Sequence, residues 1–524
     1  MAAVTIPTSY NFADLWDAVV ATVPDRTAVV CGGRRCSFAA LDARATLLAS
    51  WMSSAGVRKD DFVGVQLPNI VEHLETVLAA FKLRAVPVNV NHKYSPHELR
   101  AVFADSGIVG VVHEVKAAAH VLAASSDLPC VAWTLAVGTD YEYALATCTT
   151  SYDFDVRSND DLYVIYTGGT TGRPKGVVWR VEDAFFACLG GGDPTGALGV
   201  IESPSAIAGR IVNSDTFFAV PPLMHAAGMW PALRWLLAGA KVVLQPEFNP
   251  LEAWRLVAQE GVTIMNIVAD AMARPLIDAL RDVNVDDLAS LRIIASGGAP
   301  LSGTMKHTLV AMLPWLAVRD IYGSSETGVQ GMSLHTATEP SGRFHPRDTV
   351  ILDPETLTEK QQAQVGVIAR RDRVPLRYHN DPALSAETFR EIRGRRYALT
   401  GDHGRIEYDG SLVVLGRGTS CINSGGEKVY PAEVESALRV HRAVYDTMVL
   451  GESDERWGQR VVALVRVTPG HVVSGAELRQ HCRSLLAGFK IPKRIVFVPE
   501  LVRSAAGKPD YAWAEAVLRD NRIH

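Results

Sequence analysis

A short apolar run that leads directly into a loop of Gly, Thr and Lys most restricts what this chain can be. The run covers residues 162–166, and the loop continues to Gly176. Glycines let successive backbone N–H groups converge on an anion, threonine hydroxyls add donors, and Lys175 supplies a mobile charge. The combination predicts a phosphate-binding loop. A Walker-type loop needs Gly-Lys followed by Ser or Thr, whereas Lys175 stands between Pro174 and Gly176, which disfavours kinases and P-loop ATPases.

Helical and extended patterns alternate up to about residue 300, which predicts an α/β fold. The first helix is capped by Asn11 and closed by Pro24, and a helix over 71–84 leads into a strand over 86–90. From about residue 416 we expect a smaller α+β domain. Its expected elements are helices over 432–438 and 476–486 and strands over 448–451 and 461–467. Segments 189–206 and 338–347, rich in Gly, Pro, Asp and Arg, are expected to be surface loops.

Composition argues against several classes of protein. The 524 residues are 48% hydrophobic and 21% charged, an ordinary globular composition. A formal net charge of -5 offers no basic field for nucleic acid. Seven scattered cysteines fit neither a disulfide framework nor a zinc site, and we expect reduced, buried thiols. The sequence has no secretory signal and no apolar run approaching roughly 18 residues, so we expect a cytoplasmic protein without a transmembrane segment.

The loop at 166–176 resembles the phosphate loop of the adenylate-forming superfamily, which contains acyl-CoA synthetases, peptide-synthetase adenylation domains and luciferases. Further segments similar to those of this superfamily follow in the same order, so the resemblance covers about residues 10 to 515. These segments are 221–228, 296–300, 322–327, 378–382, 387–389, 400–402, 415–417, 422–435, 488–492 and 501–508. The resemblance implies a large, multi-layer α/β adenylation domain over 1–417 and a small, mobile α+β domain over 418–524.

The resemblance assigns the contacts of ATP and Mg²⁺ to five segments. The residues implied to hold phosphate are Thr167, Gly168, Gly169, Thr170, Thr171, Gly172 and Lys175. Those implied to surround the adenine are Gly298, Ala299, Pro300, Tyr322, Gly323, Ser324 and Ser325. Asp402 and Arg417 would hold the ribose hydroxyls, and Glu326 with Thr170 would bind Mg²⁺. An aromatic face for the base and a hard oxygen ligand for Mg²⁺ are what such a site requires.

The acyl pocket implied by the resemblance begins at His225, which would gate it. The small residues Ala226, Ala227 and Gly228 would leave volume for a bulky or long acyl group. Met229 and Trp230 would line that volume.

The small domain is implied to serve both chemical steps. Gly425 and Gly426 would border the pantetheine tunnel of coenzyme A, and Lys428 would face a phosphate. Lys508 matches the lysine that assists adenylation in the superfamily. The implied catalytic residues are Lys508, Glu326, His225 and Thr167.

The implied reaction has two steps, in which a carboxylate attacks the α-phosphorus of ATP to give acyl-AMP and pyrophosphate, and a thiol then displaces AMP. Neither step requires a nucleophilic side chain, because positioning and charge neutralisation are sufficient. Three positions depart from the common pattern: Gly168 stands where many relatives have Ser, Ser325 where Thr is common, and Thr419 at the hinge where Asp or Lys is usual. The first bears on phosphate affinity and the last on domain rotation.

Several segments are similar to actinobacterial acyl-CoA ligases of lipid and steroid catabolism, among them 178–180, 190–195, 268–275 and 423–428. We therefore expect an ATP-dependent carboxylate:CoA ligase for a hydrophobic acid, such as a fatty or steroid side-chain acid, with ATP, Mg²⁺ and coenzyme A. Two alternatives stay open here: transfer of the acyl group to a carrier-protein thiol or an amine, and a non-catalytic sensor of nucleotide or acyl-adenylate. A homodimer is also an open expectation.

Overall fold

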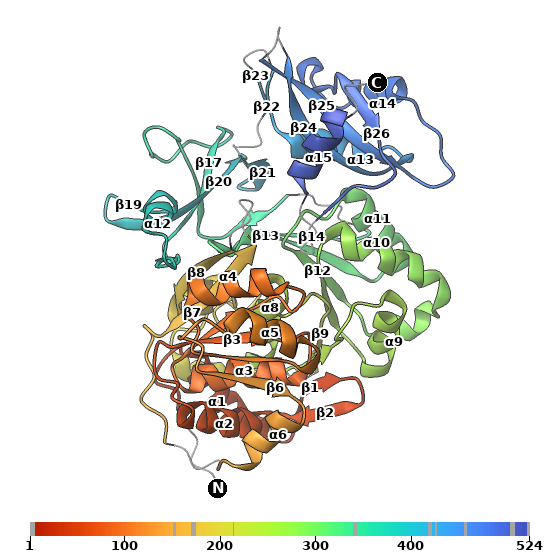
Figure 1. Cartoon of the computed structure of the whole chain (residues 1–524). Coiled ribbons are helices and arrows are strands. Elements are labelled where there is room, and N and C mark those ends of the chain that lie inside the picture. Colours follow the sequence, from red (N-terminus) through yellow and green to blue (C-terminus); the bar gives the residue numbers. More distant parts are fainter. Residues whose placement is uncertain are drawn as a thin grey trace.

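The central layer of the large domain is a nine-stranded sheet in the order β15-β14-β13-β12-β11-β9-β10-β1-β2 (Figure 1). The computed structural model describes residues 6–149, 153–168, 174–212, 214–338, 343–417, 422–424, 427–454, 458–503 and 509–520. The strands from β13 through β1 in this order run parallel to one another. Strands β14 and β15 extend one edge in antiparallel pairing, and β2 closes the other edge in the same way. The strands are β1 (Thr27–Cys31), β2 (Arg34–Ser37), β9 (Thr216–Ala219), β10 (Lys241–Leu244), β11 (Ile264–Ile267), β12 (Ile293–Gly297), β13 (Ala317–Ser324), β14 (Gly328–His335) and β15 (His345–Pro346).

Helices cover both faces of this sheet because its strands are apolar on both sides. Phe217 and Phe218 are neighbours in β9, yet they point into two different cores, as the alternation of a strand requires. One core contains α9 (Pro250–Glu260), α10 (Ala269–Ala279) and α11 (Gly303–Met312). The other contains α1 (Phe12–Thr22), α2 (Phe38–Ser54), α3 (Val71–Lys82), α7 (Val181–Ala187) and α8 (Ala226–Leu237).

A second, parallel sheet lies beside the first in the order β4-β3-β5-β6. Its elements are β3 (Phe62–Gln66), β4 (Val86–Asn89), β5 (Gly110–Glu114), β6 (Trp133–Val137), α4 (Pro96–Ser106), α5 (Ala118–Ser125) and α6 (Thr139–Ala146). The hairpin of β7 (Leu162–Gly168) and β8 (Pro174–Arg180) packs between the two sheets. Val164 faces the core of the second sheet, whereas Tyr163 and Ile165 face the core that contains α8. The predicted phosphate strand is therefore buried on both faces.

Two smaller sheets complete the chain. The first contains β16 (Thr349–Leu352), β17 (Gly366–Arg371), β19 (Phe389–Ile392), β20 (Arg395–Ile406) and β21 (Leu412–Arg417), while β18 (Arg377–Tyr378) joins the β7–β8 hairpin and α12 (Pro382–Thr388) follows it. The second contains β22 (Ile422–Ser424), β23 (Glu427–Val429), β24 (Val444–Asp454), β25 (Gly458–Val467) and β26 (Arg494–Phe497). On this last sheet, α13 (Pro431–Arg439) and α14 (Gly475–Arg483) share one core, and α15 (Tyr511–Asp520) belongs to another.

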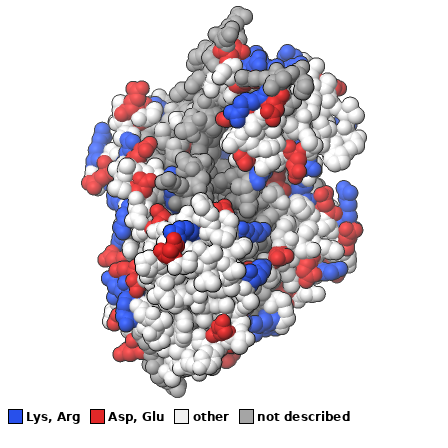
Figure 2. Space-filling model, in the orientation of Figure 1, with Lys and Arg blue, Asp and Glu red and all other residues white. Residues whose placement is uncertain are grey.

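The predicted fold class is confirmed, with a large multi-layer α/β part and a smaller α+β part (Figure 1). The opening helix is α1, and the Asn11 side chain accepts a hydrogen bond from the Ala13 N–H at 2.8 Å. The four elements predicted in the small domain correspond to α13, α14, β24 and β25. Within the described residues, no helix is long and apolar enough to cross a membrane. Basic and acidic side chains are interspersed on the face in Figure 2, in keeping with the small net charge.

Two expectations about exposure were wrong. The segment predicted to be a surface loop from residue 189 is buried as far as Pro194, and only its second half reaches the surface. It can be buried because the Asp193 carboxylate, itself 3% exposed, accepts the backbone N–H groups of Gly196, Leu198 and Gly199. The cysteines are free thiols where they are described, but only three of them, Cys36, Cys188 and Cys482, are buried.

The loop between β9 and α8 depends on one asparagine side chain. Asn69, 2% exposed, donates to the carbonyls of Ala219 and Pro221 at 3.2 and 3.0 Å and accepts from the Leu223 N–H at 2.7 Å. Asn69→Ala should lower the free energy of unfolding by about 2–3 kcal/mol, because buried partners lose their hydrogen bonds. Urea denaturation measures this loss. The control is Asn91→Ala, which removes one hydrogen bond of an exposed turn and should change the free energy by less than about 0.5 kcal/mol.

Candidate active site

The predicted nucleotide residues lie where three strands end. Thr167 and Gly168 end β7, and Lys175 is near the start of β8, so the two sides of the phosphate loop are adjacent strands paired Thr167 to Lys175. Gly298, Ala299 and Pro300 follow the end of β12. Tyr322, Gly323 and Ser324 end β13, and Ser325 and Glu326 form the turn into β14. Strands β12 and β13 are parallel neighbours, so their ends lie at one edge of the nine-stranded sheet, whereas β7 belongs to the separate sheet with β8 and β18.

Glu326 is joined to the phosphate hairpin through Tyr378. The Tyr378 hydroxyl donates to Glu326 Oε1 at 3.1 Å, and the Lys175 Nζ lies 6.0 Å from the centre of the Tyr378 ring. Because Tyr378 belongs to β18, which pairs with β8, a carboxylate and a cation from separate segments share one aromatic neighbour. The sequence places Tyr378 in a segment similar to the superfamily, but only the structure shows its contact with Glu326.

The turn that carries Glu326 is held rigidly. The Ser324 N–H donates to Thr327 Oγ1 at 3.0 Å, and the Glu326 N–H donates to Ser324 Oγ at 3.2 Å. The fully buried Trp179 of β8 donates its indole N–H to the Ser325 carbonyl at 3.1 Å. A Cβ at Gly323 would lie 2.1 Å from the carbonyl oxygen of Gly328, so only glycine fits there. The carboxylate of Glu326 thus has a fixed base.

The residues predicted to contact the adenine and the ribose lie next to one another. The Tyr322 hydroxyl donates to Asp402 Oδ2 at 2.8 Å, although the two residues are 80 positions apart. Asp402 lies in β20 and pairs in register with Arg417 of β21, so the backbones of both predicted ribose residues are adjacent. Tyr322 also contacts Phe344, with ring centres 5.9 Å apart. An aromatic ring next to a carboxylate suits a nucleoside, whose base stacks and whose vicinal diol donates hydrogen bonds.

The predicted acyl residues form the first turn of α8. His225 is its N-cap residue, and the helix begins at Ala226. A Cβ at Gly298, which has φ +88°, would lie 3.5 Å from the Cβ of Ala227, so the acyl segment faces the residues that follow β12. A Cβ at Gly228 would lie 2.4 Å from the Pro222 carbonyl oxygen, which requires glycine there. The small side chains thus bring α8 close to the strand ends.

Met229 and Trp230 point away from the strand ends into the interior. Met229 and Tyr163 line a small pocket beside β3 and β4. Trp230, 7% exposed, donates its indole N–H to the Tyr163 hydroxyl at 3.2 Å, and burial raises the pKa of Tyr163, which keeps that hydroxyl protonated. Their assignment to the acyl pocket stays a prediction.

Several predicted residues lie outside the described part of the chain. They are Gly169, Thr170, Thr171, Gly172, Thr419, Gly425, Gly426 and Lys508, and the side chains of Arg417 and Lys428. The described residues contain no group of three His, Cys, Asp or Glu side chains that could hold a metal ion.

The small domain contacts α10 and α11 of the large domain. Arg274 donates to the Tyr445 carbonyl at 2.5 Å, and its guanidinium lies 3.7 Å from the centre of the Tyr445 ring. Thr304 donates to the Arg439 carbonyl at 3.2 Å. These contacts are polar, which is typical of interfaces between domains of one chain.

This geometry defines the class of protein: an adenylate-forming enzyme, with nucleotide residues at the strand ends of the large domain and a small second domain. The family model of the AMP-binding enzyme matches residues 16–373, and that of the AMP-binding enzyme C-terminal domain matches residues 433–508. The chain belongs to this family of AMP-binding enzymes.

Relatives of known activity align with nearly the whole chain. The 3-oxocholest-4-en-26-oate–CoA ligase of Rhodococcus rhodochrous is 39% identical over 96% of this chain and 95% of that protein. The medium/long-chain-fatty-acid–CoA/3-oxocholest-4-en-26-oate–CoA ligase of Mycobacterium tuberculosis is 41% identical over the same shares. Among solved structures, ATP-bound MatB from Rhodopseudomonas palustris has a TM-score of 0.83 at 24% identity, covering 97% of this chain and 99% of that one. The anthranilate CoA ligase AuaEII in complex with anthranoyl-AMP has a TM-score of 0.85 at 22% identity, covering 99% of both chains. These two structures share the fold.

Tyr378→Phe removes the hydroxyl that donates to Glu326 while keeping the ring beside Lys175. We expect roughly tenfold weaker binding of Mg²⁺–ATP, because a hydrogen bond to a charged group contributes about 1.5–3 kcal/mol. Calorimetric titration with Mg²⁺–ATP measures the change. Tyr408→Phe, at a side chain that is 81% exposed, is the matched control. Equal affinities of the two variants would contradict a role for Tyr378 in positioning Glu326.

Proposed function

We propose that this protein ligates a hydrophobic carboxylic acid to coenzyme A at the cost of ATP, in two steps. The observation that carries the proposal is the meeting of Lys175, Tyr378 and Glu326 at the ends of the strands that carry the predicted nucleotide residues. It occurs in a chain that is 39–41% identical, over 96% of its length, to acid–CoA ligases. The chain is accordingly an AMP-forming acid–thiol ligase that uses ATP, Mg²⁺ and coenzyme A, and the identity of its acid is the part that we propose.

In the first step, a carboxylate oxygen of the acid bonds to the α-phosphorus of ATP, and the bond from that phosphorus to pyrophosphate breaks. We assign the β- and γ-phosphates to the loop 167–175, the base to Tyr322 and the ribose to Asp402. Lys508 would bridge the acid carboxylate and the α-phosphate. Mg²⁺, held by Glu326 and Thr170, would neutralise phosphate charge. The residues act by position and charge, as in phosphoryl transfer generally.

In the second step, the thiol of coenzyme A bonds to the acyl carbon, and AMP leaves with the electron pair of the broken C–O bond. A thiol with a pKa of about 8.5 needs little assistance from a base, because AMP is a good leaving group. We propose that the small domain, residues 418–524, turns against residues 1–417 between the steps, placing Gly425, Gly426 and Lys428 along the tunnel. The contact of Arg274 with Tyr445 would then have to change.

For the acid, we propose a fatty acid or a steroid side-chain acid. Both are named as substrates of the relatives described above. Ala227 at the start of α8 is small and suits a bulky or long apolar chain, whereas the space beside Gly228, which we expected to be open, is filled by the Pro222 carbonyl. The alternatives are a carrier-protein thiol or an amine as acceptor, and a sensor without catalysis.

We further propose a cytoplasmic location and a homodimer. Size-exclusion chromatography with light scattering tests the homodimer.

Pyrophosphate release with ATP, Mg²⁺ and a panel of medium and long fatty acids, steroid side-chain acids and aryl acids tests the proposal. Each acid is assayed with and without coenzyme A. One class should give turnover that depends on coenzyme A and produces AMP. Release that coenzyme A does not change would point to another acceptor, and ATP binding without release from any acid would point to a sensor.

Lys508→Ala should lower the rate of pyrophosphate release by about 100-fold or more, because a charged contact in the transition state is lost. ATP affinity should change little, since the assigned base and ribose contacts remain. Lys493→Ala is the matched control, an exposed lysine of the same domain. Equal rates for the two variants would remove Lys508 from the mechanism.

A further inference from the structure

One face of α8 leads from the acyl end of the site to a partly buried arginine, Arg234. Ala227, Pro231, Arg234 and Ala238 follow one another at spacings of four, three and four residues, so they form one stripe along the helix. Ala227 faces Gly298 beside the nucleotide residues. Arg234 lies seven residues further, roughly 10 Å along the axis at 1.5 Å per residue. The stripe thus connects the reacting end of the site with a cationic end.

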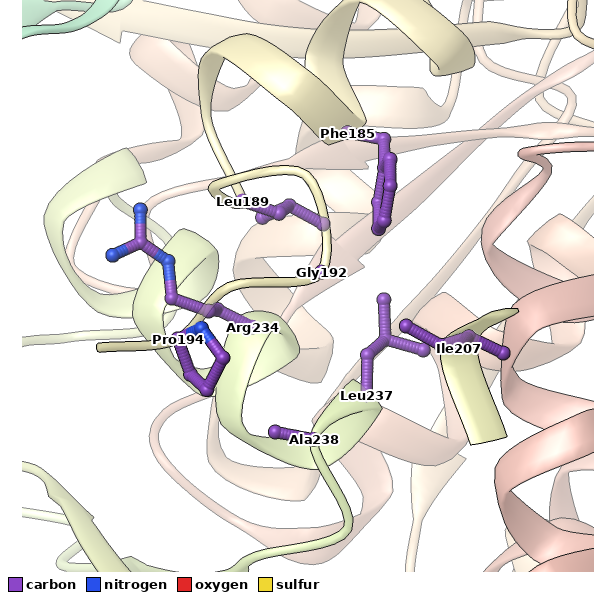
Figure 3. A pocket seen from close by; sticks show the side chains of 8 residues that line it. All are labelled: Phe185, Leu189, Gly192, Pro194, Ile207, Arg234, Leu237 and Ala238. Atoms are coloured by element: carbon purple, nitrogen blue, oxygen red, sulfur yellow. The ribbon is translucent and has the colours of Figure 1, made fainter. Parts of the chain in front are cut away.

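A small, partly open pocket lies at that cationic end (Figure 3). Its lining is mainly apolar, and Arg234 is the charged residue in it. Figure 3 shows the guanidinium of Arg234 at one side of the cavity and Ile207 at the other. Apolar walls with one charged group at the end suit a chain that is apolar along its length and polar at its tip.

Two more arginines act on Arg234. Arg319 belongs to β13, and Arg347 follows β15. Burial, together with the charges of Arg347 and Arg319, lowers the pKa of Arg234 to about 10. Burial and the charge of Arg347 also lower the pKa of Arg319. Three positive groups therefore lie close enough to repel one another.

The strand residues around Arg319 face the buried loop that begins at residue 189. Arg319 and Ile321 share one face of β13, and Met332 pairs with Ile321 in register. The Met332 Cε lies 3.3 Å from the position of a Cβ on Gly196. The same Cβ would be 3.1 Å from Nη2 of Arg347, so glycine in the loop lets the guanidinium approach the backbone.

The cluster lacks acids to match its cations. Within the described ranges, none of Arg234, Arg319 and Arg347 forms an ion pair with a carboxylate. Asp193 acts on Arg234 and Arg319 through its charge, but its carboxylate oxygens already accept backbone N–H groups of its own loop. Three partly buried cations beside one carboxylate leave an excess of positive charge, which favours an anion from outside the chain.

Two buried donors belong to Arg234 and to Gln330, whose backbone contacts Arg347. Arg234 donates one N–H to the Cys188 carbonyl at 3.1 Å, while its buried Nε has no partner in the described structure. The backbone carbonyl of Gln330, a residue that is 1% exposed, accepts the backbone N–H of Arg347 at 2.7 Å. The buried side-chain Nε2 of Gln330 also has no partner among the described residues. Guanidinium and amide N–H groups together match the oxygens of a carboxylate.

We propose that Arg234, Arg319 and Arg347 bind a second anionic group at the far end of the acid. The preferred substrate is then an otherwise apolar acid with a carboxylate at each end. This inference rests on the proposed function, in which the first carboxylate reacts with ATP and the second only anchors the chain.

Calorimetric titration of the full-length protein with decanedioic acid and decanoic acid, without ATP, tests the inference. The diacid should bind about tenfold more tightly or better, since a charged hydrogen bond is gained at the far end. Arg319→Gln should remove that preference and change decanoic acid binding by less than about twofold. Arg234→Gln should do the same, and thermal melting shows whether this more enclosed variant folds. Arg255→Gln, an exposed arginine on α9, is the matched control.

Equal affinity of the two acids in the unaltered protein, or a preference that survives Arg319→Gln and Arg347→Gln, would overturn the inference. Pyrophosphate release with the same two acids separates it from the proposed function. Release with decanoic acid but no preference for the diacid contradicts the distal anion site and leaves the ligase intact. A preference in binding that Arg319→Gln abolishes, without release from any acid, supports the anion site and contradicts the ligase.

Discussion

One asparagine side chain joins the three segments on which the site depends. Asn89, at the end of β4, donates to the carbonyls of Tyr166 and Met224 at 2.8 and 2.6 Å and accepts from the Tyr166 N–H at 2.7 Å. The phosphate strand and the residue before His225 are therefore tied to the second sheet. Backbone groups buried between sheets must be paired, and a side-chain amide can pair several at once. This tie, together with the hydrogen bonds of Asn69, fixes the start of α8 relative to the phosphate strand.

The same scaffold places polar residues near both ends of α8 and an apolar core between them. The first turn of α8 faces Gly298 beside the predicted nucleotide residues, where Glu326 and Lys175 share Tyr378 as a neighbour. Further along, the helix runs over an apolar core and ends beside arginines that have few acidic neighbours. A carboxylic acid with an apolar chain would meet polar groups at its ends and apolar groups between them. Specificity for such an acid follows from the spacing of the two polar regions as well as from the volume between them.

Local patterns were reliable where a single element decides its own structure. The Asn11 cap, the helix at α3 and the helices of the small domain were predicted correctly, because capping and apolar periodicity act within a few residues. The loop from residue 189 was predicted wrongly, because its many glycines and polar residues are typical of a surface. Its burial depends on Asp193 satisfying three backbone N–H groups, which no local pattern reveals. The roles of Asn69 and Asn89 were missed for the same reason.

The amino-acid sequence by itself determined the class of fold and the order of the segments similar to the adenylate-forming superfamily, because these depend on residue types at short spacings. Only the tertiary structure decided which side chains meet. It placed Tyr322 against Asp402, Tyr378 between Lys175 and Glu326, and three arginines around one end of α8. These residues are separated by tens to hundreds of positions and are brought together by the pairing of strands. Charge and burial then act through space, so their effects belong to the fold rather than to any segment of it.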